Sequence, residues 1–362
     1  MISGAHDVAR RASRVLLMST DAAIGLSTRS ARYFPSVWFG VAALVFFVVV
    51  FRVFGISKDW LNYDDIFDVL RVSGLGDGEE DYERIEIGFK LVALGFISLS
   101  LSNTATYALI ASIAVLVKCV AMNVLSRSGA AYFFAICFYL FAFAPLHELT
   151  QLRAALAIAF LFVSYALLIR GRYPLALGVA VAAIAFHISS VIMLPLFILI
   201  FLFQQKVFVL TRARAISFGL GVFVIVATVI AVLISYFEEE LPIIAAYQEL
   251  GFGDAPTNPL APHILLNLAM VLTGLVLWRD LSRSMRYVLF FQLAGLGVFY
   301  AALDFQVVSS RVYDLTQTFW VFFIAEGADS ENPPVRFATQ VFVLAAVAAF
   351  AYIYFFSGSF FQ

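Results

Sequence analysis

Charged residues are scarce in this chain of 362 residues. Only 13% of its positions are Asp, Glu, Lys or Arg, whereas 63% are hydrophobic; a soluble domain is about one quarter charged and about half apolar. No long polar domain follows the first apolar run, and no nucleic-acid partner is expected. The composition therefore predicts an all-α, polytopic integral membrane protein.

Cysteine pairs, metal motifs and internal repeats are also missing. Cys119 and Cys137 both lie in apolar runs, which argues against a disulfide framework or a CxxC metal site. The four histidines show no metal-ligand spacing, and no HExxH, DxD or P-loop motif occurs, so nothing demands a metal or another cofactor. No repeat of fixed period is visible, which weakens the case for a transporter built from two similar halves.

Long apolar runs are abundant instead. A helix that crosses a bilayer needs roughly 17–25 mostly apolar residues, and about eleven segments meet this description. A further run, 87–101, is short and contains Lys90, and we expect it to be interfacial or re-entrant. The predicted spans are 36–54, 105–125, 130–146, 152–169, 174–188, 190–205, 215–236, 263–279, 287–303, 310–325 and 337–357.

The distribution of basic residues predicts the orientation of these spans. Residues 1–35 contain several arginines and form a basic cytoplasmic segment under the positive-inside rule. The run that follows has no clear cleavage site and is typical of an uncleaved signal-anchor. If 87–101 does not cross, the basic loops at 126–129, 170–172, 204–214 and 279–286 are all cytoplasmic. One transmembrane domain, 36–357, then has acidic external loops at 55–86 and 237–262.

Polar side chains from distant segments gather on the external side of this topology. His147, Glu148, Gln151 and Arg153 stand at the outer end of the 152–169 span. The run 174–205 is too long for one span, and its polar interruption predicts a hairpin with its tip near His187. Arg311 and Tyr313, in "SSRVYD", lie on the same side.

Each charged or titratable residue in this group has two interpretations. A charge within a span usually faces a cavity or a partner. Arg153 can instead snorkel to the interface or pair with Glu148, and Arg311 can pair with Asp314 one helical turn away. His187 either serves chemistry or donates a hydrogen bond to a backbone carbonyl.

The segment "DWLNYDDIF" (59–67) places an acid, an amide and a tyrosine within five residues. It can be a solvated acidic loop. Aromatic rings beside carboxylates and amides are also typical of carbohydrate sites, where rings stack on sugar faces. Asp59, Asn62 and Tyr63 are therefore candidate sugar-binding residues.

Taken in order, several short motifs resemble the EpsG family of bacterial exopolysaccharide polymerases, which are related to the Wzy-type polymerases of O-antigen and capsule. The motifs are "DWLNYDDIF" (59–67), "EIGF" (86–89), "LRAALAIAF" (152–160) and "FHISSVIMLP" (186–195), with "SRVYD" (310–314) as a looser match. The family often has Arg-Gln where this chain has Arg153 followed by alanine.

The resemblance implies a polymerase at the outer face of the bacterial cytoplasmic membrane, with its active site facing the periplasm or exterior. Its substrate would be an undecaprenyl-diphosphate-linked oligosaccharide. A chain-length regulator, a flippase and export proteins are further implied partners. Arg153 and Arg311 would bind the leaving diphosphate, and His187 would be the base, with Asp59 or Glu148 as alternatives. The implied substrate contacts are Asn62, Tyr63, Glu86, His147, Glu148, Gln151 and Tyr313.

Other functions remain open on these residues. An O-antigen-ligase-like glycosyltransferase would use the same donor with a different acceptor. An exporter of the lipid-linked repeat would need ionisable groups near mid-membrane that open to each side in turn. An acyltransferase would place a catalytic histidine near an acyl donor, and no such pattern is evident.

Overall fold

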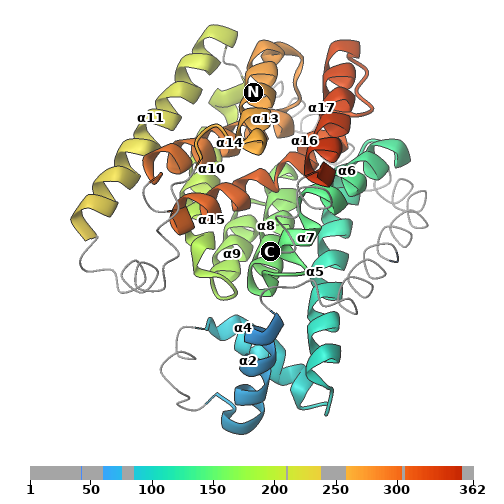
Figure 1. Ribbon diagram of the computed structural model, residues 1–362. Coiled ribbons are helices and arrows are strands. Elements are labelled where there is room, and N and C mark those ends of the chain that lie inside the picture. The colour runs from blue at the N-terminus through green and yellow to red at the C-terminus, as the bar shows by residue number, and fades with distance from the viewer. Residues whose placement is uncertain are drawn as a thin grey trace, which may run out of the picture.

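All the regular elements of the described residues are helices. The computed structural model describes residues 42, 60–75, 85–208, 211–237, 258–303 and 306–352, and Figure 1 shows their arrangement. Residues 1–35, the predicted span 36–54 and most of the predicted loop 237–262 lie outside these ranges. The all-α class is confirmed.

Among the described residues, three helices are long and apolar enough to cross a membrane, namely α5 (Asn103–Leu125), α8 (Leu152–Ile169) and α17 (Pro333–Ala351). Shorter apolar helices surround them, so the count of about eleven spans stays a prediction. The other elements are α2 (Trp60–Ser73), α4 (Ile87–Ile97), α6 (Gly129–Ala142), α7 (Ala144–His147), α9 (Tyr173–Ile184), η1 (Ile188–Ile192), α10 (Met193–Phe208), α11 (Arg212–Phe237), α13 (Pro262–Val276), η2 (Trp278–Asp280), α14 (Arg283–Ala301), α15 (Gln306–Gln317) and α16 (Trp320–Gly327).

Two expectations need correction. The predicted span 310–325 is wrong as a single helix, because α15 ends at Gln317 and α16 begins at Trp320. The Thr318 hydroxyl at this break donates to the Leu315 carbonyl at 2.7 Å, a local bond of the kind that competes with a continuing helix. The predicted loop 55–86 is also not irregular throughout, because it contains α2.

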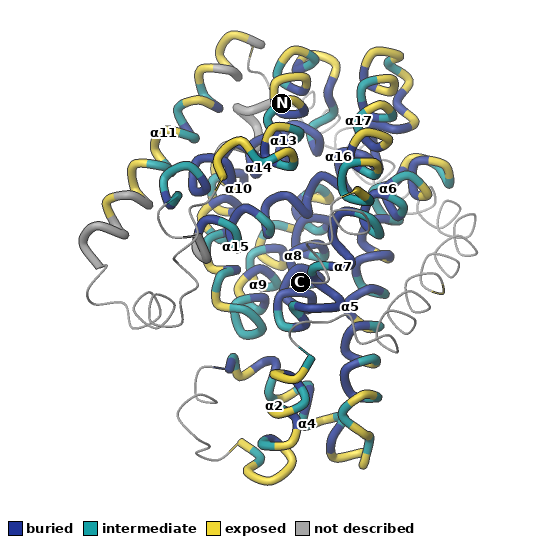
Figure 2. Tube along the Cα trace, in the orientation of Figure 1, coloured by how far each residue is buried: buried dark blue, intermediate teal, exposed yellow. Residues whose placement is uncertain are grey.

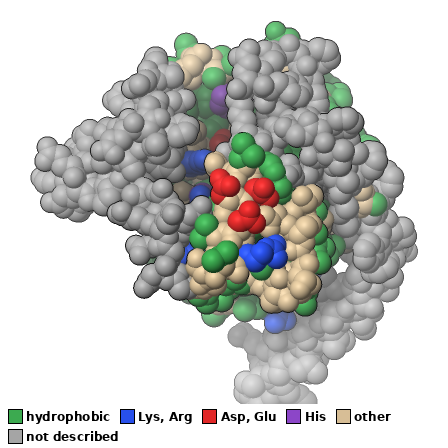
Figure 3. Space-filling view, turned by 60° about the horizontal axis from the view of Figure 1, so that its bottom comes forward, with side chains coloured by type: hydrophobic (Ala, Val, Ile, Leu, Met, Phe, Trp, Pro, Cys, Tyr) green, Lys and Arg blue, Asp and Glu red, His purple; other side chains and the backbone are tan. Residues whose placement is uncertain are grey.

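Helices α2 and α4 form a lobe at one end of the molecule, and α5 runs from this lobe into the main bundle (Figure 1). Asn103, at the start of α5, donates to Asp64 at 3.0 Å and to Asp68 at 2.7 Å, and it accepts from Arg71 at 2.9 Å. Figure 3 shows acidic and basic side chains side by side at this end of the molecule. The polar network fixes α2 on α5.

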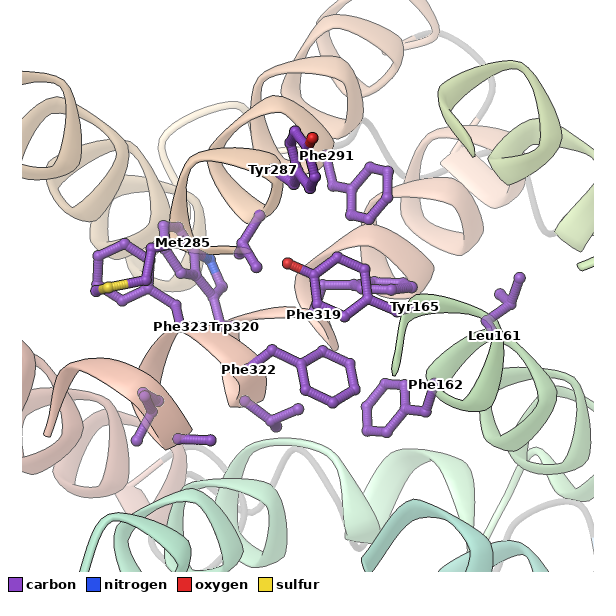
Figure 4. Close-up of a cluster of buried hydrophobic side chains, with 14 of the residues drawn as sticks. Leu161, Phe162, Tyr165, Met285, Tyr287, Phe291, Phe319, Trp320, Phe322 and Phe323 are labelled. Atoms are coloured by element: carbon purple, nitrogen blue, oxygen red, sulfur yellow. The ribbon is translucent and has the colours of Figure 1, made fainter. Parts of the chain in front are cut away.

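Helix α8 lies near the centre of the main bundle and is buried along most of its length (Figure 2). The Tyr165 ring stacks on Phe322 with centroids 4.7 Å apart, and Phe319 lies edge-on to both Tyr165 and Phe291 (Figure 4). Alanines toward the start of α8 allow close packing on α5, since small residues let helix backbones approach. The first turn of α8 is therefore a rigid platform.

The predicted hairpin near His187 is present. Helix α9 ends at Ile184, His187 has an extended backbone with φ −158°, and η1 and α10 follow. Helix α4 has 11 residues, so it is about 16 Å long, roughly half of a bilayer core. That length suits the expected interfacial or re-entrant segment.

Candidate active site

The carboxylate of Glu86 joins three separate segments of the chain. Its Oε2 accepts from Arg153 Nη1 of α8 at 2.8 Å, and its Oε1 accepts from the Ile188 backbone N–H at 3.1 Å. His187 Nδ1 lies 3.3 Å from the same Oε1. We refer to Glu86, Arg153 and His187 as the Glu86 cluster.

A close backbone contact brings Glu86 to the hairpin. The Gly88 N–H, near the start of α4, donates to the Ala185 carbonyl at the end of α9 at 2.7 Å. A Cβ at position 88 would lie only 2.5 Å from that carbonyl oxygen. Glycine is therefore required for α4 to approach α9, and this approach places Glu86 against His187.

Tyr63 of α2 also fixes the first turn of α8. Its hydroxyl accepts from the Arg153 backbone N–H at 3.3 Å. The N-cap residue Gln151 makes no side-chain capping bond, so this hydroxyl satisfies one of the free N–H groups of the helix start. The Tyr63 ring packs against Phe89 and Tyr107, with centroids 5.8 and 5.7 Å away.

The Glu86 cluster is only partly shielded. The side chains of Glu86, His187 and Arg153 are 11%, 14% and 32% exposed, so the guanidinium is the most accessible group. Burial alone would raise the pKa of Glu86, but the contact with His187 and the charge of Arg153 outweigh it and lower the pKa to about 2. The carboxylate is thus ionised at any physiological pH.

A second charged group lies deeper in the bundle. Lys118, in the second half of α5, forms an ion pair with Glu148 Oε1, and both side chains are fully buried. The Tyr139 hydroxyl of α6 donates to the same oxygen at 2.6 Å and accepts from Lys118 at 2.9 Å. The Tyr107 hydroxyl donates to the Glu148 backbone carbonyl at 3.0 Å. Glu148 is therefore held by α5 and α6 together.

His147 stands beside this pair. It is only 1% exposed, and neither ring nitrogen has a hydrogen-bond partner among the described residues. Burial, followed by the charges of Lys118, Arg311 and His187, lowers its pKa well below the ordinary value. His147 therefore lies within the electrostatic reach of both the Lys118–Glu148 pair and the Glu86 cluster.

Arg311 approaches from α15, which packs against η1. Its side chain is half-buried. Within the described part of the chain it has no carboxylate at ion-pair distance, and the expected partner Asp314 makes no such pair. Because η1 directly follows His187, the packing of α15 on η1 brings the helix that carries Arg311 next to the hairpin.

The structure thus brings Glu86, Arg153, His187 and Tyr63 into contact, while Glu148 belongs to a separate ion pair. The alternative partner proposed for Arg153 was wrong, because Arg153 pairs with Glu86 while Glu148 pairs with Lys118. Three further expected residues form no hydrogen bond with the Glu86 cluster: Asn62 is exposed, Gln151 is half-buried with no side-chain capping bond, and Tyr313 donates to the His263 carbonyl at 3.3 Å. Asp59 lies outside the described residues.

Lys118 and Gly88 were not identified from the sequence. A lone lysine within an otherwise uncharged span, "AVLVKCVAM", is a functional candidate because a charge there is costly, so Lys118 could have been found. Gly88 could not have been found, because its role depends on a contact with a carbonyl 97 positions away in sequence.

Comparison with known proteins gives one match. A family model described as the EpsG family matches residues 36–362. No curated protein and no solved structure matches the chain. The matched range covers nearly the whole chain and includes every residue of the site described above.

Proposed function

Since the chain belongs to the EpsG family, whose members are exopolysaccharide-polymerase-like membrane proteins, we propose that it joins undecaprenyl-diphosphate-linked oligosaccharide repeats into a polysaccharide. The reaction takes place at the outer face of the bacterial cytoplasmic membrane. One observation carries the proposal: Glu86 holds a cation suited to diphosphate and a histidine suited to proton transfer within a single cluster.

The transfer reaction determines which chemical groups the site needs. An acceptor hydroxyl on one repeat attacks the anomeric carbon at the end of the growing chain. A new carbon–oxygen bond forms as the bond to the diphosphate breaks, and undecaprenyl diphosphate departs with both electrons. The hydroxyl proton passes to a base. The site therefore needs a base for the acceptor and fixed cations for the leaving group.

His187 is the base in this scheme. The ionised Glu86 carboxylate lies 3.3 Å from Nδ1, and a proton on that nitrogen would leave Nε2 free to accept one. The same carboxylate stabilises the imidazolium after proton transfer, as the aspartate does in serine-protease triads. Glu148, an alternative base, is less suited because Lys118 and Tyr139 already occupy one of its oxygens.

Arg153 and Arg311 bind the leaving diphosphate. Glu86 engages Nη1 of Arg153, while the guanidinium is the most exposed group of the cluster and keeps further donors for a phosphate oxygen. Arg311 has no carboxylate at ion-pair distance among the described residues, although its charge acts on Asp314. The two guanidinium groups would stabilise the negative charge that develops on the diphosphate.

Other side chains shape the sugar sites in this proposal. Tyr63, beside Arg153, and the neighbouring Asn62 would bind sugar hydroxyls at the α2–α4 lobe. His147, at the end of α7, and Gln151, at the start of α8, would face the repeat. A chain-length regulator, a flippase and export proteins would act before or after this enzyme.

Deletion of the gene, followed by sizing of the lipid-linked glycan, tests the proposal. Single repeats should accumulate on undecaprenyl diphosphate, and the wild-type gene should restore long chains whereas an Arg153→Ala variant should not. Long unattached chains in the deletion strain would contradict the proposal and favour a ligase. Matched protein levels in the membrane are the control.

A further inference from the structure

Lys118 and Glu148 form an ion pair in the interior of the helix bundle, where burying a charge costs free energy. Both side chains are fully buried, and Lys118 is the only charged residue of α5. Removing two charges from water costs several kcal/mol for each ion, and replacing such a pair by apolar residues is often neutral or stabilising. Stability alone is therefore a poor explanation for this pair.

The Lys118–Glu148 pair fixes the short turn between α7 and α8. Glu148 is the C-cap of α7, and the segment from Glu148 to Gln151 leads directly into α8. Lys118, Tyr139 and Tyr107 together bind the side chain and the backbone carbonyl of Glu148. The turn is thereby fixed from α5 and α6.

His147 depends on this turn for its orientation. Neither ring nitrogen has a partner among the described residues, and its ring stacks on Phe143 with centroids 6.2 Å apart. Arg153, in contrast, is bound directly by Glu86 and Tyr63. Disturbing the Lys118–Glu148 pair should therefore affect His147 more than Arg153.

We propose that Lys118 and Glu148 are positioning residues for the reaction, which fix the α7–α8 turn so that the His147 imidazole, buried and without a hydrogen-bond partner among the described residues, forms a hydrogen bond with a sugar hydroxyl once the substrate enters. This inference rests on the proposed function. His147 can donate through one ring nitrogen and accept through the other, so it matches a sugar hydroxyl, which also does both. Lys118 and Glu148 themselves do not contact the substrate.

The test combines two sets of substitutions. One removes the charges of Lys118 and Glu148, and the other removes the imidazole of His147. The full chain is reconstituted in liposomes with a lipid-linked single repeat, and turnover is measured for Lys118→Met/Glu148→Gln, for His147→Ala and for the combined variant. We expect about a ten-fold loss for each of the first two. In the His147→Ala background the pair substitution should cost less than about two-fold, because coupled residues are not additive.

A binding measurement separates this inference from the proposed function. Undecaprenyl diphosphate should raise the melting temperature of the Lys118→Met/Glu148→Gln variant as much as that of the wild type, since Arg153 keeps its own contacts. Failure of the wild type to extend chains and to bind undecaprenyl diphosphate would overturn the proposed function. Wild-type turnover in the pair variant, wild-type turnover in His147→Ala, or an additive combined loss would overturn the inference alone.

A milder substitution covers the case in which the pair variant does not accumulate in the membrane. Tyr139→Phe removes only the hydroxyl that bonds to Glu148, and we expect about a three-fold loss of turnover. Tyr132→Phe is the matched control on the same helix, because the Glu148 carboxylate is bonded by Lys118 and Tyr139 and not by Tyr132. Equal turnover in these two variants would contradict the proposal.

Discussion

Glu86 and Arg153 are 67 positions apart in sequence, yet the carboxylate Oε2 accepts a hydrogen bond from the guanidinium Nη1 at 2.8 Å. The other carboxylate oxygen faces His187. One acidic side chain therefore sets the relative position of the proposed leaving-group cation and the proposed base. A change at Glu86 should affect both.

Glu86→Gln should reduce chain extension by about 10²-fold, the upper range for loss of a carboxylate that orients a functional histidine. The amide keeps the size of the side chain but not its charge, so His187 loses the group that stabilises its protonated form. Chain extension in liposomes at matched protein amounts provides the measurement. Asp65→Asn, at an exposed position of α2, is the control and should behave as the wild type.

Arg153→Lys should recover little activity, with about a 10²-fold loss. A lysine ammonium cannot bridge Glu86 and a phosphate oxygen with the planar fork of a guanidinium. Initial rates at several donor concentrations would measure the effect. Arg172→Lys, at an exposed position before α9, controls for the substitution itself. Full activity of Arg153→Lys would mean that charge alone suffices.

Gly88→Ala should lower both the melting temperature and the activity. The added Cβ would lie 2.5 Å from the Ala185 carbonyl oxygen, so α4 must move away from α9 and carry Glu86 away from His187. Gly95→Ala is the matched control on the same helix, since a Cβ there meets nothing within 4 Å. It should be neutral or stabilising by up to about 1 kcal/mol. Equal melting temperatures for the two variants would refute the close approach.

The stabilisation from Glu86 should depend on pH in a defined direction. The pKa of Glu86 is lowered from 4.5 to about 2, so the folded state favours the ionised carboxylate. Its contribution is fully present above about pH 4.5 and is lost as the pH falls toward about 2. The melting-temperature difference between wild type and Glu86→Gln should therefore be larger at about pH 5 than at about pH 3. Equal differences at these two pH values would contradict the lowered pKa.

The helices themselves were largely predictable from the sequence, because apolar runs of membrane length form helices in lipid whatever their neighbours. The prediction failed where local bonding interrupts an apolar run, as at Thr318 between α15 and α16. It also treated 55–86 as a loop, although α2 buries Tyr63 and Phe67 against α4 and α5.

Several residues of the candidate site were singled out from the sequence, but the contacts between them were not. A charge or a histidine in an apolar run indicates a functional position, and this identified Arg153, His187 and Glu148. The pairing was not predictable, since it depends on α4 approaching α9 and on Lys118 reaching the α7–α8 turn. Sequence proximity favoured Glu148 as the partner of Arg153, whereas the fold supplies Glu86.

Chain growth by the purified protein is the most direct measurement of the central claim. Wild-type protein in liposomes, supplied with an undecaprenyl-diphosphate-linked repeat, should produce longer glycans and release undecaprenyl diphosphate. His187→Ala and Arg311→Ala, at equal protein amounts and with wild-type melting temperatures, should leave the repeat unextended. Wild-type product length from either variant would contradict the account.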